Sequence, residues 1–174
     1  ESFPRKPCPS LPAVAGVLKA MAQHGINPKA VDLKPEEIAD LIARGLGRKA
    51  GFINVTFTSI DQSIERGDAE MGLSGIEDTP ARRDTMAPTV PYYQFREVLS
   101  VRDADASRFR ALADLRGRRV GTLGGTIAYE ILLRAERDLG IQAVSYDDDV
   151  HPYSDLVIGR LDAVLLDNVL AERR

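Results

Sequence analysis

The regular alternation of strand-like and helix-like segments between residues 118 and 168 constrains the fold most strongly. Apolar, β-rich runs over 118–125, 141–148 and 161–168 predict strands, the first of which ends in a glycine-rich turn. Helices are predicted between them over 126–140 and 150–160. Strands that alternate with helices pair in parallel through right-handed crossovers. The sequence therefore predicts an α/β fold with mostly parallel sheets flanked by helices.

The first half of the chain continues this plan less regularly. A proline-rich extended arm over 1–10 precedes an amphipathic helix over 11–24. Further helices are predicted over 35–47, 59–68 and, as a connector, 104–117. Strands are predicted over 50–59, 69–75 and 97–102. The β-α-β plan thus occurs twice, which predicts two α/β parts.

Composition excludes several classes of function. The net charge of −3 and a pI near 5.5 argue against nucleic acid as the main partner. One cysteine, Cys8, and two distant histidines, His24 and His151, make a zinc site a poor hypothesis, and we expect neither a metal nor a cofactor. No apolar run approaches the roughly 18–20 residues of a membrane span. The first residues do not show the basic, then apolar pattern of a secretory signal.

Polar, glycine-containing stretches follow three of the predicted strands. They are Ser-Gly-Ile-Glu-Asp-Thr at 74–79, Leu-Gly-Gly-Thr at 123–126 and Leu-Leu-Asp-Asn at 165–168. Ligands of parallel α/β sheets bind beyond the carboxyl ends of the strands. The three stretches therefore predict a ligand-binding site. A nucleotide is not favoured, since 121–126 lacks the Lys-Ser/Thr of a phosphate loop and the spacing of a dinucleotide fingerprint.

Three longer motifs, in this order, resemble those of the amino-acid-type extracellular solute-binding proteins of ABC uptake systems. The first is SIERGDAEMGLSGIEDTPARRDTMAPTVPYY, with its Ser-Gly turn, Thr-Pro-x-Arg and paired tyrosines. The second is LADLRGRRVGTLGGTIAYEIL, and the third is LVIGRLDAVLLDN. Together they extend over roughly residues 38–170, and jointly they are far more specific than any one alone.

The resemblance implies a two-lobed type II periplasmic-binding fold and a binding protein that is not an enzyme. It places lobe 1 at 35–98, a hinge at 99–102, lobe 2 at 103–166 and a second hinge with the return to lobe 1 at 167–174, after an atypical segment at 1–34. The implied ligand is a small polar amino acid of the glutamine, glutamate or basic type, gripped between the lobes. The implied partner is an ABC transporter permease, and the implied location is the periplasm or the extracellular face of a bacterial membrane.

Carried over by position, the family pattern assigns five ligand contacts. Arg82 is implied to hold the ligand α-carboxylate with two parallel donors. The carbonyl of Gly75 and the carboxylate of Asp167 are implied to receive the ligand ammonium group. Thr126 is implied to offer its hydroxyl and the amides of a helix start, and Phe57 an aromatic face for the ligand side chain.

Each of these residues also has a structural interpretation, and both stay open at this point. Arg82 can be a solvated arginine at a helix start, and Phe57 a core residue. Gly75 can serve its turn alone, as glycines usually do. Asp167 can cap a helix that begins at Asn168.

The chain departs from the family pattern in three places. Glu77, which we include among the ligand-binding candidates, stands where Thr or Ser commonly bonds the ligand carboxylate; it would repel that group unless Arg82 neutralises it or the ligand brings a cation. Residues 1–34 do not resemble the family's first strand, although 11–31 weakly resemble its closing helix. The chain is also shorter than a complete two-lobed member. A fragment, a chimera and a circular permutation are the explanations left open, and an incomplete lobe would favour self-association.

Two other functions fit the same fold. One is a ligand sensor, or a remnant or engineered fragment that no longer binds, because fold alone does not establish function. The other is a dehydratase acting on arogenate or prephenate, which needs a general acid and base in the pocket. Glu77 is the one unexpected ionisable residue for that chemistry.

Overall fold

The structure is a computed structural model that describes residues 35–89, 91 and 94–173. The chain divides into two compact units. One contains residues up to 54 together with 60–94, and the other contains 55–59 together with 95–174. We call them the N-terminal unit and the C-terminal unit and describe each by itself. The predicted arm and helix over 1–24, with Cys8 and His24, and the paired Tyr92 and Tyr93 lie outside the described residues.

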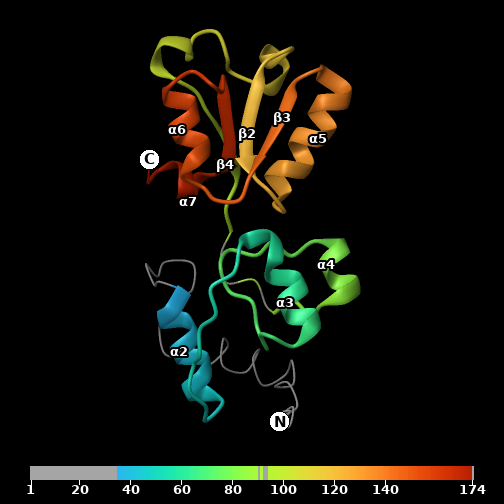
Figure 1. The fold of residues 1–174 in the computed structure, drawn as a ribbon, viewed down its shortest axis with the longest axis vertical. Coiled ribbons are helices and arrows are strands. Elements are labelled where there is room, and N and C mark those ends of the chain that lie inside the picture. The colour runs from blue at the N-terminus through green and yellow to red at the C-terminus, as the bar shows by residue number, and fades with distance from the viewer. Residues whose placement is uncertain (1–34, 90, 92–93, 174) are drawn as a thin grey trace. The chain divides into compact units, whose positions relative to one another are not determined.

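The C-terminal unit is built on a four-stranded sheet in the order β1-β4-β2-β3 (Figure 1). Strand β2 pairs in parallel with both β3 and β4, and β1 pairs antiparallel with β4. The strands are β1 (Glu97–Ser100), β2 (Arg119–Leu123), β3 (Gln142–Tyr146) and β4 (Ala163–Asp167). This arrangement confirms the predicted α/β class with a mixed, mostly parallel sheet.

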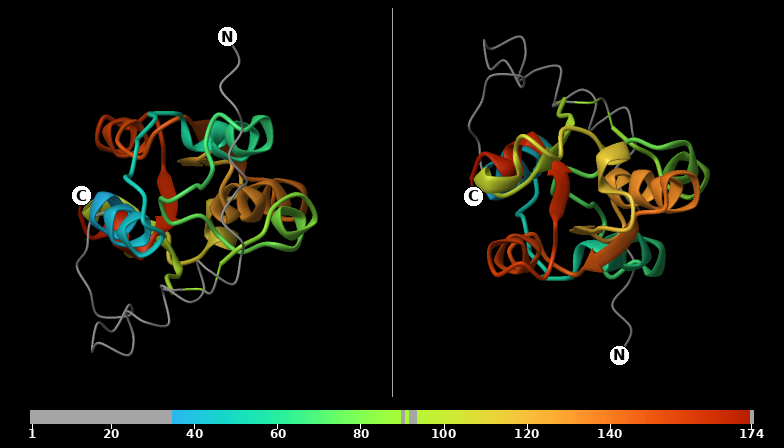
Figure 2. Two further views of the ribbon diagram at one scale, coloured as in Figure 1. Left: turned by 90° about the horizontal axis from the view of Figure 1, so that it is seen from below. Right: turned by 90° about the horizontal axis from the view of Figure 1, so that it is seen from above.

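Helices cover both faces of this sheet (Figures 1 and 2). Helix α5 (Ile127–Leu139) connects β2 to β3, and α6 (His151–Val157) connects β3 to β4. Alternate residues of β4 point to opposite sides, as the pleat requires. Ala163 and Leu165 pack in the cluster on the α5 side, whereas Val164 and Leu166 pack in the cluster with Leu156 of α6. The two clusters place the core on both faces of one sheet.

Short elements complete the C-terminal unit. The predicted helix over 104–117 is instead two 3₁₀ turns, η2 (Asp103–Asp105) and η3 (Leu112–Leu115). The last described element is helix α7 (Asn168–Ala171), which begins directly after β4.

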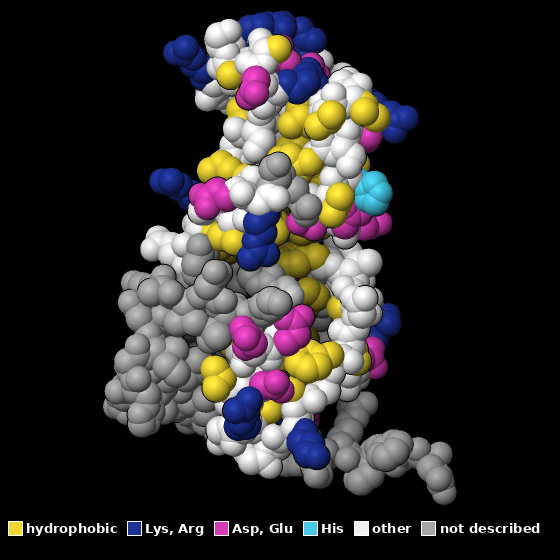
Figure 3. Space-filling view, turned by 90° about the vertical axis from the view of Figure 1, so that its left-hand side faces the viewer, with side chains coloured by type: hydrophobic (Ala, Val, Ile, Leu, Met, Phe, Trp, Pro, Cys, Tyr) yellow, Lys and Arg dark blue, Asp and Glu magenta, His cyan; other side chains and the backbone are white. Residues whose placement is uncertain are grey.

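The side of the unit that carries α6 and α7 shows hydrophobic side chains at its surface (Figure 3).

The described residues of the N-terminal unit form three helices and no strand. Helix α2 (Pro35–Gly45) is the predicted one, with proline in its first turn and Glu36 and Glu37 at its positively polarised end. The other two are α3 (Ile60–Arg66) and α4 (Pro80–Thr85).

Two predicted strands in the first half are wrong. Residues 48–56 have no regular secondary structure, 57–59 form the 3₁₀ turn η1 (Phe57–Ser59), and 69–75 form no strand. A segment in which apolar and polar residues alternate forms a strand only where a neighbouring strand can pair with it. Within the described part of the chain neither segment has such a partner. Phe52 and Ile53 are accordingly 61% and 52% exposed.

No helix in the described ranges is long and apolar enough to cross a membrane. The same residues contain no cluster of three or more His, Cys, Asp or Glu side chains suited to a metal ion.

Candidate functional site

Arg82 is positioned by the short helix α4. Thr79 is the N-cap of this helix, and its hydroxyl accepts a hydrogen bond of 3.2 Å from the backbone N–H of Arg82. Pro80 follows at the first helical position, where its fixed φ suits the helix and its missing N–H costs nothing. The sequence Thr-Pro therefore starts the helix at one residue and fixes the backbone from which Arg82 extends.

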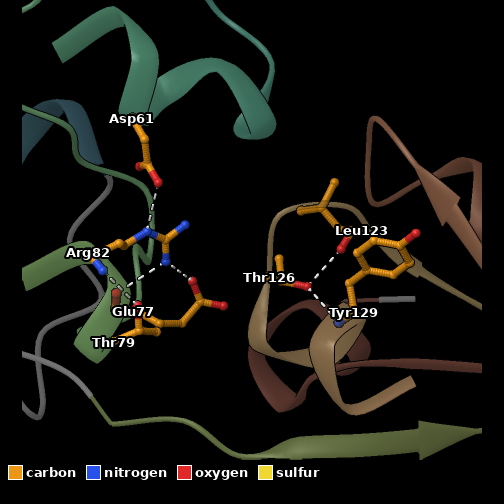
Figure 4. A network of polar contacts seen from close by, with 7 residues as sticks. All are labelled: Asp61, Glu77, Thr79, Arg82, Leu123, Thr126 and Tyr129. Carbon is orange, nitrogen blue, oxygen red and sulfur yellow. Dashed lines mark hydrogen bonds and ion pairs between the residues drawn. The ribbon is translucent and has the colours of Figure 1, made fainter. Parts of the chain in front are cut away.

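The guanidinium of Arg82 is held by two carboxylates of the N-terminal unit (Figure 4). Its Nη1 donates to Glu77 Oε2 at 2.6 Å and to the backbone carbonyl of Glu77 at 3.1 Å. Its Nε donates to Asp61 Oδ2, on α3, at 3.1 Å. The side chains of Arg82 and Glu77 are 13% and 6% exposed, so this ion pair is largely shielded from water.

The environment of Arg82 shifts its pKa in two directions. Burial alone would lower the pKa of Arg82, because it disfavours the charged form. The hydrogen bonds and charges of Glu77 and Asp61 outweigh burial, so the pKa of Arg82 lies above its usual value. Arg82 is therefore a permanent cation in this cluster.

Asp61 is the member of the cluster that sequence reasoning missed. It lies 21 residues before Arg82, and its place in the first turn of α3 is already explained by the helix dipole. Its second oxygen, Oδ1, is buried and has no hydrogen-bond partner among the described residues. Two carboxylates around one guanidinium give the Asp61–Glu77–Arg82 cluster one net negative charge.

The neighbouring pair Asp78 and Arg83 is separate from this cluster. Arg83 Nε and Nη2 donate to the two oxygens of Asp78, both at 2.6 Å, and the Arg83 side chain is 63% exposed. Gly75, the other candidate in this unit, has a φ of +66° and lies in a bend of the irregular segment before α4. That positive φ explains why glycine stands there whether or not its carbonyl meets a ligand.

In the C-terminal unit, Thr126 is the buried N-cap of α5 (Figure 4). Its hydroxyl donates to the carbonyl of Leu123 at 2.7 Å and accepts from the N–H of Tyr129 at 3.3 Å. The hydroxyl thus joins the carboxyl end of β2 to the start of α5. A helix of this length has a positively polarised end at Thr126, which suits an anionic group.

Two glycines before Thr126 allow another segment to approach the turn. A side chain built at Gly125 would lie 3.4 Å from the backbone of Thr58 and 3.9 Å from the ring of Phe57, and Gly125 itself has a φ of +74°. Phe57 packs, partly buried, against the cluster that contains Leu123 and Leu166. The structural interpretation of Phe57 as a packing residue is therefore confirmed, and its ring lies beside the turn.

Asp167 ends β4 and is the N-cap of α7. Its Oδ1 accepts hydrogen bonds from the N–H groups of Val169 and Leu170 at 2.9 and 3.0 Å. Because β2 and β4 are adjacent and parallel, Asp167 and the turn before Thr126 lie at the same end of the sheet. The capping role that the sequence left open for Asp167 is confirmed, and one carboxylate oxygen accepts both of these bonds.

Comparison with known proteins identifies the family of this chain. Residues 30–165 match the family model described as bacterial extracellular solute-binding proteins, family 3. The chain belongs to this family. The recognition drawn from the three motifs is therefore confirmed.

Relatives within the family are distant. The chain is 27% identical over 134 residues to the ABC transporter arginine-binding protein 1 of Escherichia coli K12, covering 77% of this chain and 53% of that protein. It is 32% identical over 136 residues to the L-arginine-binding protein of Pseudomonas aeruginosa, covering 78% and 52%. This family member thus spans about half the length of the curated relatives it matches.

Solved structures agree with this assignment. An ancestral arginine-binding protein bound to arginine aligns with a TM-score of 0.75 at 26% identity, over 79% of this chain and 60% of that one. Holo ArgBP from T. maritima aligns with a TM-score of 0.72 at 28% identity, over 79% and 59%. The α/β periplasmic-binding fold predicted from the sequence is confirmed by these alignments.

The six predicted site residues of this family member fall into two groups. The N-terminal unit contains Gly75, Glu77 and Arg82, of which the last two are in direct contact. The C-terminal unit contains Phe57, Thr126 and Asp167 at one end of its sheet. Chemically, the first group offers a guanidinium with two carboxylates, and the second a helix start with a capping carboxylate.

Proposed function

We propose that this family member binds a small polar amino acid as the substrate-binding component of an ABC uptake system. The ligand is of the glutamine, glutamate or basic type, and arginine is the first candidate, since the proteins named above are arginine-binding by name or were solved with arginine. The proposed partner is a membrane permease, and the proposed location is the periplasm or the extracellular face of a bacterial membrane.

Arg82 carries this proposal. Its guanidinium is held at a fixed position by a capped helix and two carboxylates, and its family position is that of the residue expected to bind the ligand α-carboxylate. By their family positions, Thr126 and Asp167 of the C-terminal unit are proposed as further ligand contacts. The start of α5 suits the carboxylate, and the negative charge of Asp167 suits the ammonium group.

The test is a thermal-shift screen of the purified chain against each of the twenty amino acids. A bound ligand raises the unfolding temperature because it binds the folded state alone. We expect a rise with arginine or another polar amino acid that is lost in Arg82→Met and kept in Arg83→Met. A folded chain whose unfolding temperature responds to none of the twenty would refute the proposal.

A further inference from the structure

We infer that Glu77 is a specificity-determining residue: its carboxylate already occupies Arg82, so the site favours an amino acid that carries an extra cation over a neutral one of the same shape. This inference rests on the proposed function, because it assumes that the ligand carboxylate approaches Arg82. The direct contact between the Glu77 carboxylate and the Arg82 guanidinium carries it.

Glu77 contacts Arg82 through both its side chain and its backbone. Both the side-chain carboxylate and the backbone carbonyl of Glu77 accept hydrogen bonds from the same nitrogen, Nη1, at 2.6 and 3.1 Å. The Thr79 cap and Pro80 fix the short segment between Glu77 and Arg82 that makes this possible. Glu77 is therefore an internal carboxylate held on the guanidinium, and at 6% side-chain exposure it is shielded from competing water.

The charge balance of the cluster determines which ligand it accepts. Asp61, Glu77 and Arg82 carry one net negative charge before any ligand arrives. A ligand carboxylate brought to Arg82 adds a third carboxylate to one guanidinium, and repulsion between neighbouring like charges opposes this. A ligand with a cationic side chain brings a positive charge that offsets the net negative charge of the cluster. A ligand with a neutral side chain has no net charge and cannot offset it.

The cluster also has an acceptor that such a cation can satisfy. Asp61 Oδ1 is buried and, among the described residues, has no hydrogen-bond partner. A buried carboxylate oxygen without a donor is costly, and a donated hydrogen bond from an ammonium or guanidinium group removes that cost. The substrate class is therefore a cationic amino acid, with arginine and its neutral isostere citrulline as the matched pair that reveals it.

The experiment measures calorimetric dissociation constants for arginine and citrulline on the whole chain. In the unaltered chain we expect arginine to bind about tenfold or more tightly than citrulline, the effect of about one charged hydrogen bond. Glu77→Gln keeps the size and an acceptor oxygen but removes the charge. In this variant citrulline binding should strengthen and the ratio should fall to about threefold or less.

Asp78→Asn is the matched control. It changes the net charge by the same amount at the adjacent residue, whose carboxylate pairs with Arg83 and not with Arg82. We expect its arginine-to-citrulline ratio to equal that of the unaltered chain. Glu77→Thr provides a second substitution if Glu77→Gln does not unfold cooperatively.

The outcomes separate the inference from the proposed function. Equal binding of arginine and citrulline by the unaltered chain overturns the role of Glu77, as does a ratio that Glu77→Gln leaves unchanged or that Asp78→Asn lowers equally. In those cases amino-acid binding itself stands. If neither amino acid binds the folded chain or any folded variant, both the inference and this ligand class for the proposed function fail.

Discussion

Arg82 and Glu77 are joined by an ion pair with a nitrogen–oxygen distance of 2.6 Å, and the side chains of both are more than four-fifths buried. The pair has a structural consequence that does not depend on any ligand. The opposite charges offset the cost of placing both groups in a shielded position, and removing one partner takes this ion pair away from the other. Stability and ligand binding are therefore expected to depend on the same guanidinium.

Arg82→Met should lower the free energy of unfolding by roughly 2 kcal/mol or more, because it removes the ion pair with the shielded carboxylate of Glu77. Arg83→Met removes a cation of the same kind from a 63% exposed side chain, and its effect should stay within about 0.5 kcal/mol. Urea unfolding of both variants is the measurement. Equal losses of unfolding free energy in the two variants would contradict the stabilising role of the buried Arg82 ion pair.

Two substitutions at Asp167 should separate its role as a helix cap from its proposed role as a charged ligand contact. Asp167→Ala removes both hydrogen bonds to the start of α7 and should cost about 1 kcal/mol of unfolding free energy, whereas Asn is as good an N-cap as Asp. Asp167→Asn should thus keep the stability yet weaken binding of the amino acid if the carboxylate meets its ammonium group. Chemical unfolding and calorimetry together make the comparison. Unchanged affinity in Asp167→Asn would remove Asp167 from the proposed site.

The phenol of Tyr146 should ionise at a higher pH than an ordinary tyrosine side chain. Burial, followed by its 2.7 Å hydrogen bond to Asp155, raises the pKa of Tyr146 to about 12 from 10.0. Since the folded state raises this pKa, the stabilisation is fully present below pH 10 and is lost as the pH rises toward 12. The ultraviolet absorbance of tyrosinate, compared with that of Tyr146→Phe, should show one tyrosine ionising near pH 12. Loss of a component near pH 10 in the variant would contradict this.

Helix α5 provides a matched test of the core. Leu132 is 0% exposed in the cluster on its face of the sheet, while its neighbour Leu133 is 41% exposed. Leu132→Ala should cost about 2–5 kcal/mol of unfolding free energy through lost burial and the cavity left behind. Leu133→Ala should cost under about 1 kcal/mol. Urea unfolding followed by circular dichroism checks both, and similar costs would show that the helix is packed differently.

Periodicity predicted the C-terminal unit well because its elements bury regular patterns. Strand β4 is apolar on both faces and therefore reads as a continuous apolar run, and α5 presents one apolar stripe between its Thr126 cap and Gly140. In the N-terminal unit the same reasoning failed. Residues 50–57 alternate as a strand would, but alternation cannot show whether a partner strand is there to pair with.

The candidate site was predictable to a different extent at each residue. The resemblance drew attention to Arg82, but its place on a helix capped by Thr79 required the structure. For Asp167 the sequence left a capping role open beside the implied ligand contact, and the structure shows the cap. Asp61 was not predictable, because its contact with Arg82 joins two helices 21 residues apart and has no local pattern. Glu77 was noticed as a departure from the family pattern, yet its direct bond to Arg82 required the structure.

The most direct test of the central claim is a calorimetric titration of the chain with arginine, alongside Arg82→Met and Arg83→Met. We expect saturable binding with a stoichiometry near one, lost in Arg82→Met and retained in Arg83→Met. Retained affinity in a folded Arg82→Met variant would contradict it, because Arg82 would then not hold the ligand.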